Sequence, residues 1–568
     1  MARLAVRAVQ SLISRRTFLR GAAAGALIAP FGSRVAAQPA ADVLYNGVRL
    51  GRPWPPRLTY ADRYPVTPPY LRNPPAVIPI DVGRQLFVDD FLIERTSLSR
   101  TLHRAEYHPA NPVLRPEKPW ELTDPVSERT KRTPNPAAMV FSDGVFFDPA
   151  DRLFKMWYMG GYGGTTCLAT SADGITWTRP TFDVVAGTNI VSNISRDSST
   201  VWLDLNETNR AHRYKMSMWY EKAISLFVSP DGIHWTLAGR TGPAGDRSTF
   251  FYNPFRKVWV FSVRADENAS GSISGRFRRY WEGQNFLDAS DWRGMAPVAW
   301  VKADTSDFAR PDAQSAPELY TLDGAGYESL MLGFFSIWRG ESNVREKINE
   351  VTLGFSRDGF HWHRPDREAF LPVSETPGSW NYANVQSAGG GCLIVGDRLH
   401  IYVSGRQGVP GSDQPGVCTT GLATLRRDGF ASMDWMPGQM RVHRKIDDPS
   451  GAGVLITRPL TFSGAHLFVN ADLEGGELRV EVLSESGDVI APLSRSNAVP
   501  ITGNATRHAV VWKDGSIAAV AGRPVRLRFI VTRGRIYSFW VSPWPTGESR
   551  GYTAAGGPGF ARGIDTRD

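Results

Sequence analysis

Apolar and polar residues alternate along most of the chain in short runs of strand length. At residues 525–531 the order is Val, Arg, Leu, Arg, Phe, Ile, Val, and residues 465–470 (AHLFVN) show a similar pattern before a Gly-rich turn. Alternation with a period of two is typical of strands with one buried face. No stretch outside the first 37 residues approaches 18 apolar residues, the length that a membrane helix needs. The pattern predicts an all-β protein.

A seven-residue motif, S-x-D-G-x-x-W, divides the middle of the chain. Copies begin at Ser171, Ser229 and Ser356, and a shorter fourth copy, R-D-G-F, begins at Arg427. The offsets between copies are 58, 127 and 71 residues. Because 127 is close to two periods, one repeat unit between Ser229 and Ser356 lacks the motif. Asn253-Pro254, followed by an aromatic strand, marks that unit. We expect a structural turn in which Gly adopts positive φ, Ser and Asp accept bonds from turn amides, and Trp covers the sheet.

Each repeat has the content of a four-stranded antiparallel sheet, which is typical of a propeller blade. We expect five innermost strands, around residues 139–147, 198–203, 246–252, 314–322 and 384–393. The predicted fold class is all-β, a five-bladed β-propeller followed by a C-terminal β-sandwich. The predicted regions are an N-terminal extension packing on the propeller at 38–130, the propeller at 131–445, the sandwich at 446–546 and a disordered tail at 547–568.

The first 37 residues read as a twin-arginine signal peptide. They hold six arginines and no acid, with S-R-R-T-F-L-R at 14–20, a short apolar run and small residues at 35–37. This predicts a periplasmic or secreted protein with no membrane span after cleavage. Without these residues the formal charge falls from +9 to +3, which argues against a nucleic-acid partner. The three cysteines allow at most one disulfide within the chain and show no zinc spacing.

Several phrases resemble bacterial hydrolases of the glycoside hydrolase family thirty-two-like group, within the invertase and arabinanase type. These phrases are LFVDD at 86–90, FKMWY at 154–158, SRDGFHW at 356–362 and LTF with LFVN at 460–470. In those families an Asp, a second Asp and a Glu act from inner strands. The W-M-N-D-P-N-G, R-D-P and E-C-P motifs of invertases are missing, so the resemblance implies the place of the site and leaves the sugar open.

Glycoside hydrolysis needs two carboxyl groups, one as acid and one as nucleophile or base. We therefore predict catalytic roles for Asp143, Asp246 and Glu318, with Glu318 as the general acid because an acid within an apolar strand is costly unless it is used or paired. The predicted substrate is an oligosaccharide or polysaccharide. The predicted substrate-binding residues are Asp197, Arg247, Arg276, Tyr327, Glu328, Asn384 and Gln386.

Two alternatives stay open at this point. The missing invertase motifs favour a non-catalytic carbohydrate-binding propeller. Tyr327-Glu328 favours a sialidase-like enzyme that acts on an acidic glycan. In that alternative the carboxylate-binding cluster consists of Arg247, Arg276, Arg278 and Arg279. We expect no cofactor and no catalytic metal; the oxygen ligands of a propeller channel would suit a structural Ca²⁺, which the sequence does not place.

Overall fold

The structure is a computed structural model that describes residues 42–58, 64–267, 274–292, 294–313, 315–340, 345, 347–436 and 451–567. The predicted signal peptide lies outside these residues. The described chain is almost entirely β, as predicted, with short helices α1 (Pro69–Arg72), α2 (Pro119–Leu122) and α3 (Pro125–Thr130).

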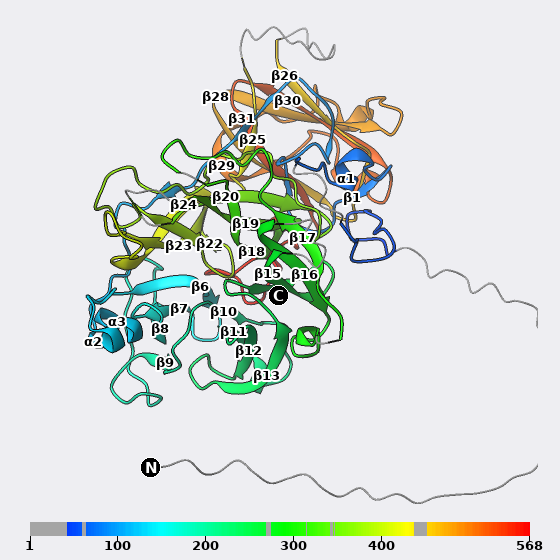
Figure 1. Cartoon of the computed structure of the whole chain (residues 1–568). Coiled ribbons are helices and arrows are strands. Elements are labelled where there is room, and N and C mark those ends of the chain that lie inside the picture. The colour runs from blue at the N-terminus through cyan, green and yellow to red at the C-terminus, as the bar shows by residue number, and fades with distance from the viewer. Residues whose placement is uncertain are drawn as a thin grey trace, which may run out of the picture. The chain divides into compact units, whose positions relative to one another are not determined.

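Three four-stranded sheets follow one another along the chain, each antiparallel and in sequence order (Figure 1). Their strands are β6 (Ala138–Asp148), β7 (Leu153–Gly160), β8 (Thr165–Ser171) and β9 (Ile190–Ser192); β10 (Ser199–Leu203), β11 (Tyr214–Tyr220), β12 (Ala223–Ser229) and β13 (Thr236–Pro243); and β14 (Thr249–Asn253), β15 (Val258–Glu267), β16 (Ser274–Gly283) and β17 (Val298–Lys302).

A nine-stranded sheet continues this series. It contains β18 (Glu318–Glu328), β19 (Leu330–Gly340), β20 (Ile348–Ser356), β21 (Asn384–Ser387), β22 (Leu393–Val395), β23 (Arg398–Arg406), β24 (Cys418–Arg426), β5 (Glu106–Tyr107) and β32 (Tyr552–Thr553). Strands β20 and β21 pair in parallel only at Asn349 and Asn384. The first strands of successive groups pack together: β6 on β10, β10 on β14, β14 on β18, and β21 and β23 on β6. Side chains of these strands therefore meet at a common centre.

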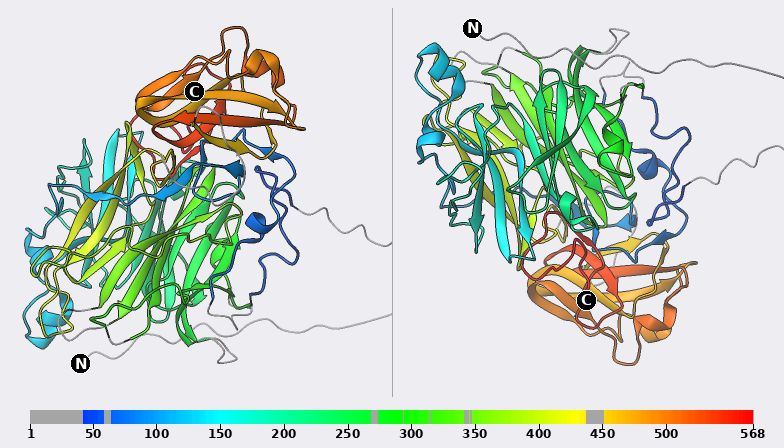
Figure 2. Two further views of the ribbon diagram at one scale, coloured as in Figure 1. Left: turned by 90° about the horizontal axis from the view of Figure 1, so that it is seen from above. Right: turned by 90° about the horizontal axis from the view of Figure 1, so that it is seen from below.

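The sequence predicts that residues 38–130, the N-terminal extension, pack on the propeller. In the structure this extension also forms part of another sheet. It contributes four strands to an eleven-stranded sheet that is otherwise built from the C-terminal part (Figure 2). Those strands are β1 (Ile78–Pro79), β2 (Gln85–Leu86), β3 (Ile93–Thr96) and β4 (Ser99–Leu102); the others are β25 (Ala431–Asp434), β26 (Gly453–Thr457), β27 (Leu460–Thr461), β28 (His466–Ser484), β29 (Ile501–Val510), β30 (Val525–Thr532) and β31 (Arg535–Ser542).

The S-x-D-G-x-x-W motif forms the predicted turn. Ser171 Oγ accepts a bond from Gly174 N at 2.8 Å, and Asp173 Oδ1 accepts from the amides of residues 175 and 176, each at 2.8 Å. The copies at 229 and 356 repeat these contacts. The three glycines have φ of 74°, 79° and 79°, which residues with a Cβ rarely adopt. The motif is a structural turn.

The segment after Pro545 is ordered, which corrects the prediction of a disordered tail. Strand β32 pairs with the end of β18, Phe147 N donates to Ala555 O at 3.0 Å, and Ile394 N donates to Gly556 O at 2.9 Å. Its glycines permit this close approach, because a Cβ on Gly557 would lie 1.9 Å from Ile394 O. The glycines of this segment allow dense backbone packing against the ends of the inner strands.

Candidate functional site

A bulge in β6 brings two side chains toward the common centre. Met139 pairs with Met159 and Gly144 pairs with Trp157, so five residue steps on β6 face two steps on β7. Ser142 has φ of 63° within this bulge. A bulge redirects side chains from the regular alternation. Here the redirected residues include Phe141 and Asp143.

Asp143 forms a fully buried ion pair with Arg196, which precedes β10. Arg196 Nη2 donates to Asp143 Oδ2 at 2.6 Å, and both side chains have no exposed surface. Burial raises the pKa of Asp143, while Arg196 and the nearby Arg247 oppose that shift. Arg196 Nη1 also donates to the Asp197 carbonyl at 3.2 Å, which links Asp143 to the predicted substrate-binding residue Asp197.

Arg247, just before β14, connects three of the predicted positions. Its guanidinium donates to Gln386 Oε1, lies 3.9 Å from Asp197 Oδ1, and sits 3.4 Å from the Phe141 ring centre. Gln386 Nε2 in turn donates to Asn384 Oδ1 at 2.7 Å. We call these residues the inner-strand cluster: Asp143, Arg196, Asp197, Arg247, Asn384 and Gln386.

The other two predicted catalytic acids are partly exposed and each pairs with an arginine. Asp246 pairs with Arg264, and its side chain is 28% exposed. Glu318, the first residue of β18, lies 3.8 Å from Arg276 Nε and is 25% exposed. A ligand can therefore reach these two carboxylates, whereas Asp143 is out of reach. Arg264 and Arg276, the partners of these two acids, both help to lower the pKa of the buried Arg278.

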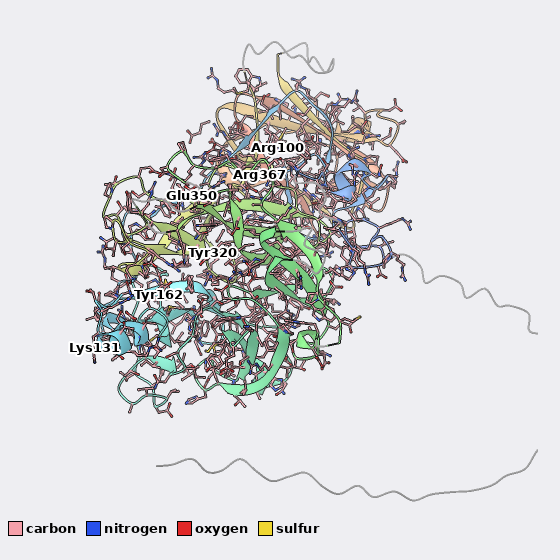
Figure 3. All side chains as sticks on the ribbon, viewed as in Figure 1. Arg100, Lys131, Tyr162, Tyr320, Glu350 and Arg367 are labelled. Atoms are coloured by element: carbon pink, nitrogen blue, oxygen red, sulfur yellow. The ribbon has the colours of Figure 1, made fainter. Side chains whose placement is uncertain are left out.

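Tyr320 joins Glu318 to the inner-strand cluster. Its ring lies 4.8 Å from the guanidinium of Arg276 and 5.5 Å from that of Arg247. Tyr320, on β18, and Tyr162, in the turn between β7 and β8, are both labelled in Figure 3.

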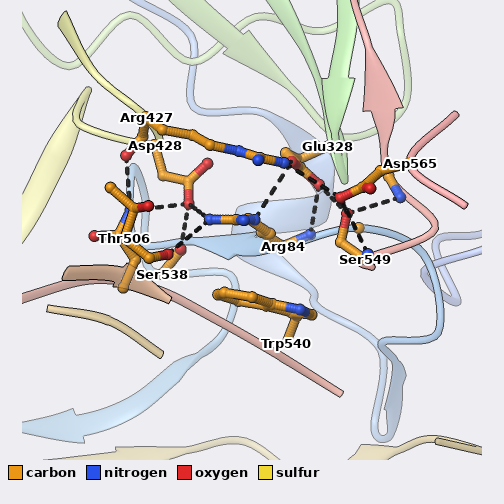
Figure 4. A network of polar contacts seen from close by, with 12 residues as sticks. Arg84, Glu328, Arg427, Asp428, Thr506, Ser538, Trp540, Ser549 and Asp565 are labelled. Atoms are coloured by element: carbon orange, nitrogen blue, oxygen red, sulfur yellow. Dashed lines mark hydrogen bonds and ion pairs between the residues drawn. The ribbon is translucent and has the colours of Figure 1, made fainter. Parts of the chain in front are cut away.

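Tyr327 and Glu328 lie elsewhere, at the far end of β18 from Glu318. Glu328 Oε1 accepts from Arg427 at 3.0 Å, and its Oε2 accepts from Ser549 Oγ at 2.6 Å (Figure 4). The Tyr327 hydroxyl donates to Asp428 Oδ1 at 2.7 Å. At about 3.3 Å per residue, the eleven-residue strand separates its two ends by roughly 30 Å. The structure thus brings Arg247, Arg276 and Glu318 together without Tyr327 and Glu328.

One buried acid of the site, Asp323, was missed from the sequence, and the buried Arg278 was predicted only as one member of an arginine cluster. Asp323, in the middle of β18, accepts a bond from Ser387 Oγ, and burial raises its pKa to about 7 against the opposing effect of Arg247 and Arg278. Arg278 Nη1 donates to the Arg247 carbonyl at 2.8 Å. Asp323-Gly324 reads as a turn in the sequence, and three nearby arginines on β16 give no sign of which one points inward.

Within the residues that the structure describes, no three His, Cys, Asp or Glu side chains are placed to hold a metal ion. The three cysteines are buried and unpaired with one another. No helix among the described residues is long and apolar enough to cross a membrane.

Comparisons with known proteins give structural matches alone. No protein-family model matches the sequence, and no curated protein matches it. Among solved structures, a glycoside hydrolase family 43 arabinoxylan arabinofuranohydrolase from Bacillus subtilis is 9% identical, with 78% of this chain and 99% of that one covered at a TM-score of 0.33. A fructofuranosidase from Schwanniomyces occidentalis is 12% identical, with 77% and 98% covered at 0.33. An N-acetylgalactosamine deacetylase from F. plautii is 12% identical, with 56% and 97% covered at 0.36.

Proposed function

We propose that this protein is an exported glycoside hydrolase that cleaves an oligosaccharide or polysaccharide at the centre of a five-bladed propeller. The blades are the three four-stranded sheets, the group β18–β20, and the group β21–β24 with β5; the eleven-stranded sheet is the accompanying β-sandwich. The packing of β6, β10, β14, β18 and β21 around one centre supports this architecture.

The observation that carries the proposal is the pair of partly exposed carboxylates at the starts of adjacent inner strands. Asp246 lies before β14, Glu318 begins β18, and these two strands pack on each other. The direct ion pair with Arg264 favours the ionised form of Asp246, which suits a nucleophile or base. We assign the other carboxyl group, Glu318, which lies 3.8 Å from Arg276 Nε, as the proton donor to the leaving oxygen.

Asp143 has a different role in this mechanism, because it is fully buried against Arg196. We assign it to positioning: it holds Arg196, whose other nitrogen bonds the Asp197 main chain at the edge of the site. Asn384 and Gln386 position Arg247 in the same way.

The test is hydrolysis of aryl glycosides and of plant and bacterial polysaccharides by the mature protein. Loss of general acid catalysis should lower the turnover of Glu318→Gln on polysaccharides by about 100- to 10,000-fold. The loss should be smaller on aryl glycosides, whose leaving group needs little protonation. Asp246→Asn should lose activity on both substrates, and Arg210→Gln, at an exposed position, should match the wild type.

Two results would count against the proposal. Unchanged turnover in both acid variants would remove the assigned roles. Saccharide binding without hydrolysis of any substrate would instead indicate a carbohydrate-binding protein.

A further inference from the structure

Arginine and aromatic side chains alternate across the site in one continuous stack. Successive guanidinium and ring centres lie between 3.4 and 5.5 Å apart. The members, in order, are Tyr162, Arg406, Phe141, Arg247, Tyr320, Arg276 and Trp338. We call this the arginine–aromatic stack. A ring face attracts a cation, so each ring holds its arginines in fixed places.

The stack leaves guanidinium nitrogens without hydrogen-bond partners. Nε and Nη1 of Arg247 and Nη1 of Arg276 are shielded from solvent and donate to no partner within the protein, and the same holds for Nε of the neighbouring Arg278. Arg247 is 1% exposed and Arg278 is fully buried. Buried donors of this kind are costly unless something binds them.

Several arginines act on one another in the site, and the buried Asp323 acts on Arg278 in the opposite sense. Arg278 bonds the carbonyls of Arg247 and Leu319 and forms no ion pair with a described carboxylate. Burial and the neighbouring Arg264, Arg247 and Arg276 lower its pKa well below the usual value. A bound anion would relieve this repulsion, and a neutral sugar would not.

We infer that the saccharide is anionic and that a uronic acid carboxylate binds Arg276 between the faces of Tyr320 and Trp338. This inference rests on the proposed function and specifies its substrate class. Arg276 is the accessible member, with a side chain 22% exposed. Arg247 and Arg278 lie behind it and supply positive potential in a low-dielectric setting. The aromatic faces suit the apolar face of a sugar ring.

The experiment measures binding by calorimetry in the Asp246→Asn background, where turnover is blocked. The probes are oligomers of galacturonate, glucuronate and mannuronate, each as the free acid and as the methyl ester, together with sodium sulfate. At least one free acid should bind about tenfold or more tightly than its ester, because the ester removes only the charge. Adding Arg276→Gln should weaken the binding of that free acid by about 10- to 100-fold and should change the binding of its ester little.

Arg210→Gln serves as the matched control and should leave binding unchanged. The inference is overturned if no free acid binds more tightly than its ester, if Arg276→Gln leaves free-acid binding intact, or if sulfate binds as tightly as the oligomer. Cleavage of a neutral polysaccharide without free-acid preference would overturn the inference and keep the proposed function. Binding of the free acid without any cleavage by the wild type would overturn the proposed function and keep the inference that the ligand is anionic.

Discussion

Two buried networks of arginine and carboxylate lie at opposite ends of β18 and differ in how their charges are balanced. At the far end, Arg84 faces Asp428 at 3.1 Å and Glu328 at 3.6 Å, and Arg427 faces Glu328 at 3.0 Å and Asp565 at 3.2 Å. We call this network the clasp (Figure 4). At the other end, Arg278 meets no described carboxylate, and Arg247 lies 3.9 Å from its nearest one.

The clasp balances its charges within the protein. Its arginines each meet two carboxylates, Ser538 and Ser549 hydroxyls donate to the same acids, and Arg84 stacks 4.0 Å above the Trp540 ring. It joins β18, the loop after β24, the N-terminal extension and the C-terminal tail. The clasp also has two buried nitrogens without hydrogen-bond partners, Nε of Arg84 and Nε of Arg427. The two networks therefore differ in their ion pairs rather than in their free donors: Arg247 has its nearest carboxylate at 3.9 Å, and Arg278 has no ion pair with a described carboxylate. The same residue types hold segments together at one end, and in the proposed function they bind a ligand at the other.

Breaking the clasp should have the largest effect. Arg84→Met leaves Glu328 and Asp428 with one guanidinium fewer in a buried site, and we expect the free energy of unfolding to fall by about 3–5 kcal/mol. Denaturant titration measures this change. Arg240→Gln, in an exposed pair with Glu221, is the control and should cost about 0.5 kcal/mol or less. Equal effects of the two variants would refute the role given to the clasp.

Asp323 should make the free energy of unfolding depend on pH, and we expect this effect to be smaller than that of Arg84→Met. Its folded pKa of about 7 lies above the ordinary carboxyl value of 3.8, so between these values the folded state holds a proton that the unfolded state releases. This contribution is present below about pH 4 and is lost as the pH rises toward 7. Asp323→Asn should therefore gain stability relative to the wild type between pH 5 and 8. A difference that stays constant with pH would contradict this.

Arg278→Met makes the same chemical change as Arg84→Met, but at a position where no ion pair is lost. We expect it to change the free energy of unfolding least of the three variants. The carbonyls of Arg247 and Leu319 lose a donor, but a buried uncompensated charge is also removed. We expect a change in the free energy of unfolding of about 1 kcal/mol or less. A loss as large as that of Arg84→Met would show that the protein itself balances the charge of Arg278.

The sequence predicted what depends on local pattern. The S-x-D-G-x-x-W turn needs only Ser, Asp and Gly at fixed spacing, so its geometry and the sheets beside it follow from the repeat. The positions of Asp197, Arg247 and Asn384 could also be predicted, because each begins or shortly precedes an inner strand, and Gln386 follows within the same strand as Asn384.

What the sequence did not reveal depends on contacts distant along the chain. The bulge at residues 139–144 is set by register with β7, and no composition signal marks it. Glu328 belongs to the clasp because Arg84 and Ser549 reach it from segments more than 200 residues away. Asp323-Gly324 has the local signature of a turn, and only pairing with β19 makes it strand.

The C-terminal tail covers the ends of strands that lie far earlier in the sequence. Asp565 completes the clasp, and the residues around Ala555 and Gly556 bond the ends of β6 and β22. Because these residues follow all the strands that they contact, the contacts form only after those strands have been synthesised. A chain truncated after Glu548 would keep Asp246 and Glu318 but lose these backbone bonds, and the uncovered strand ends would be open to proteases.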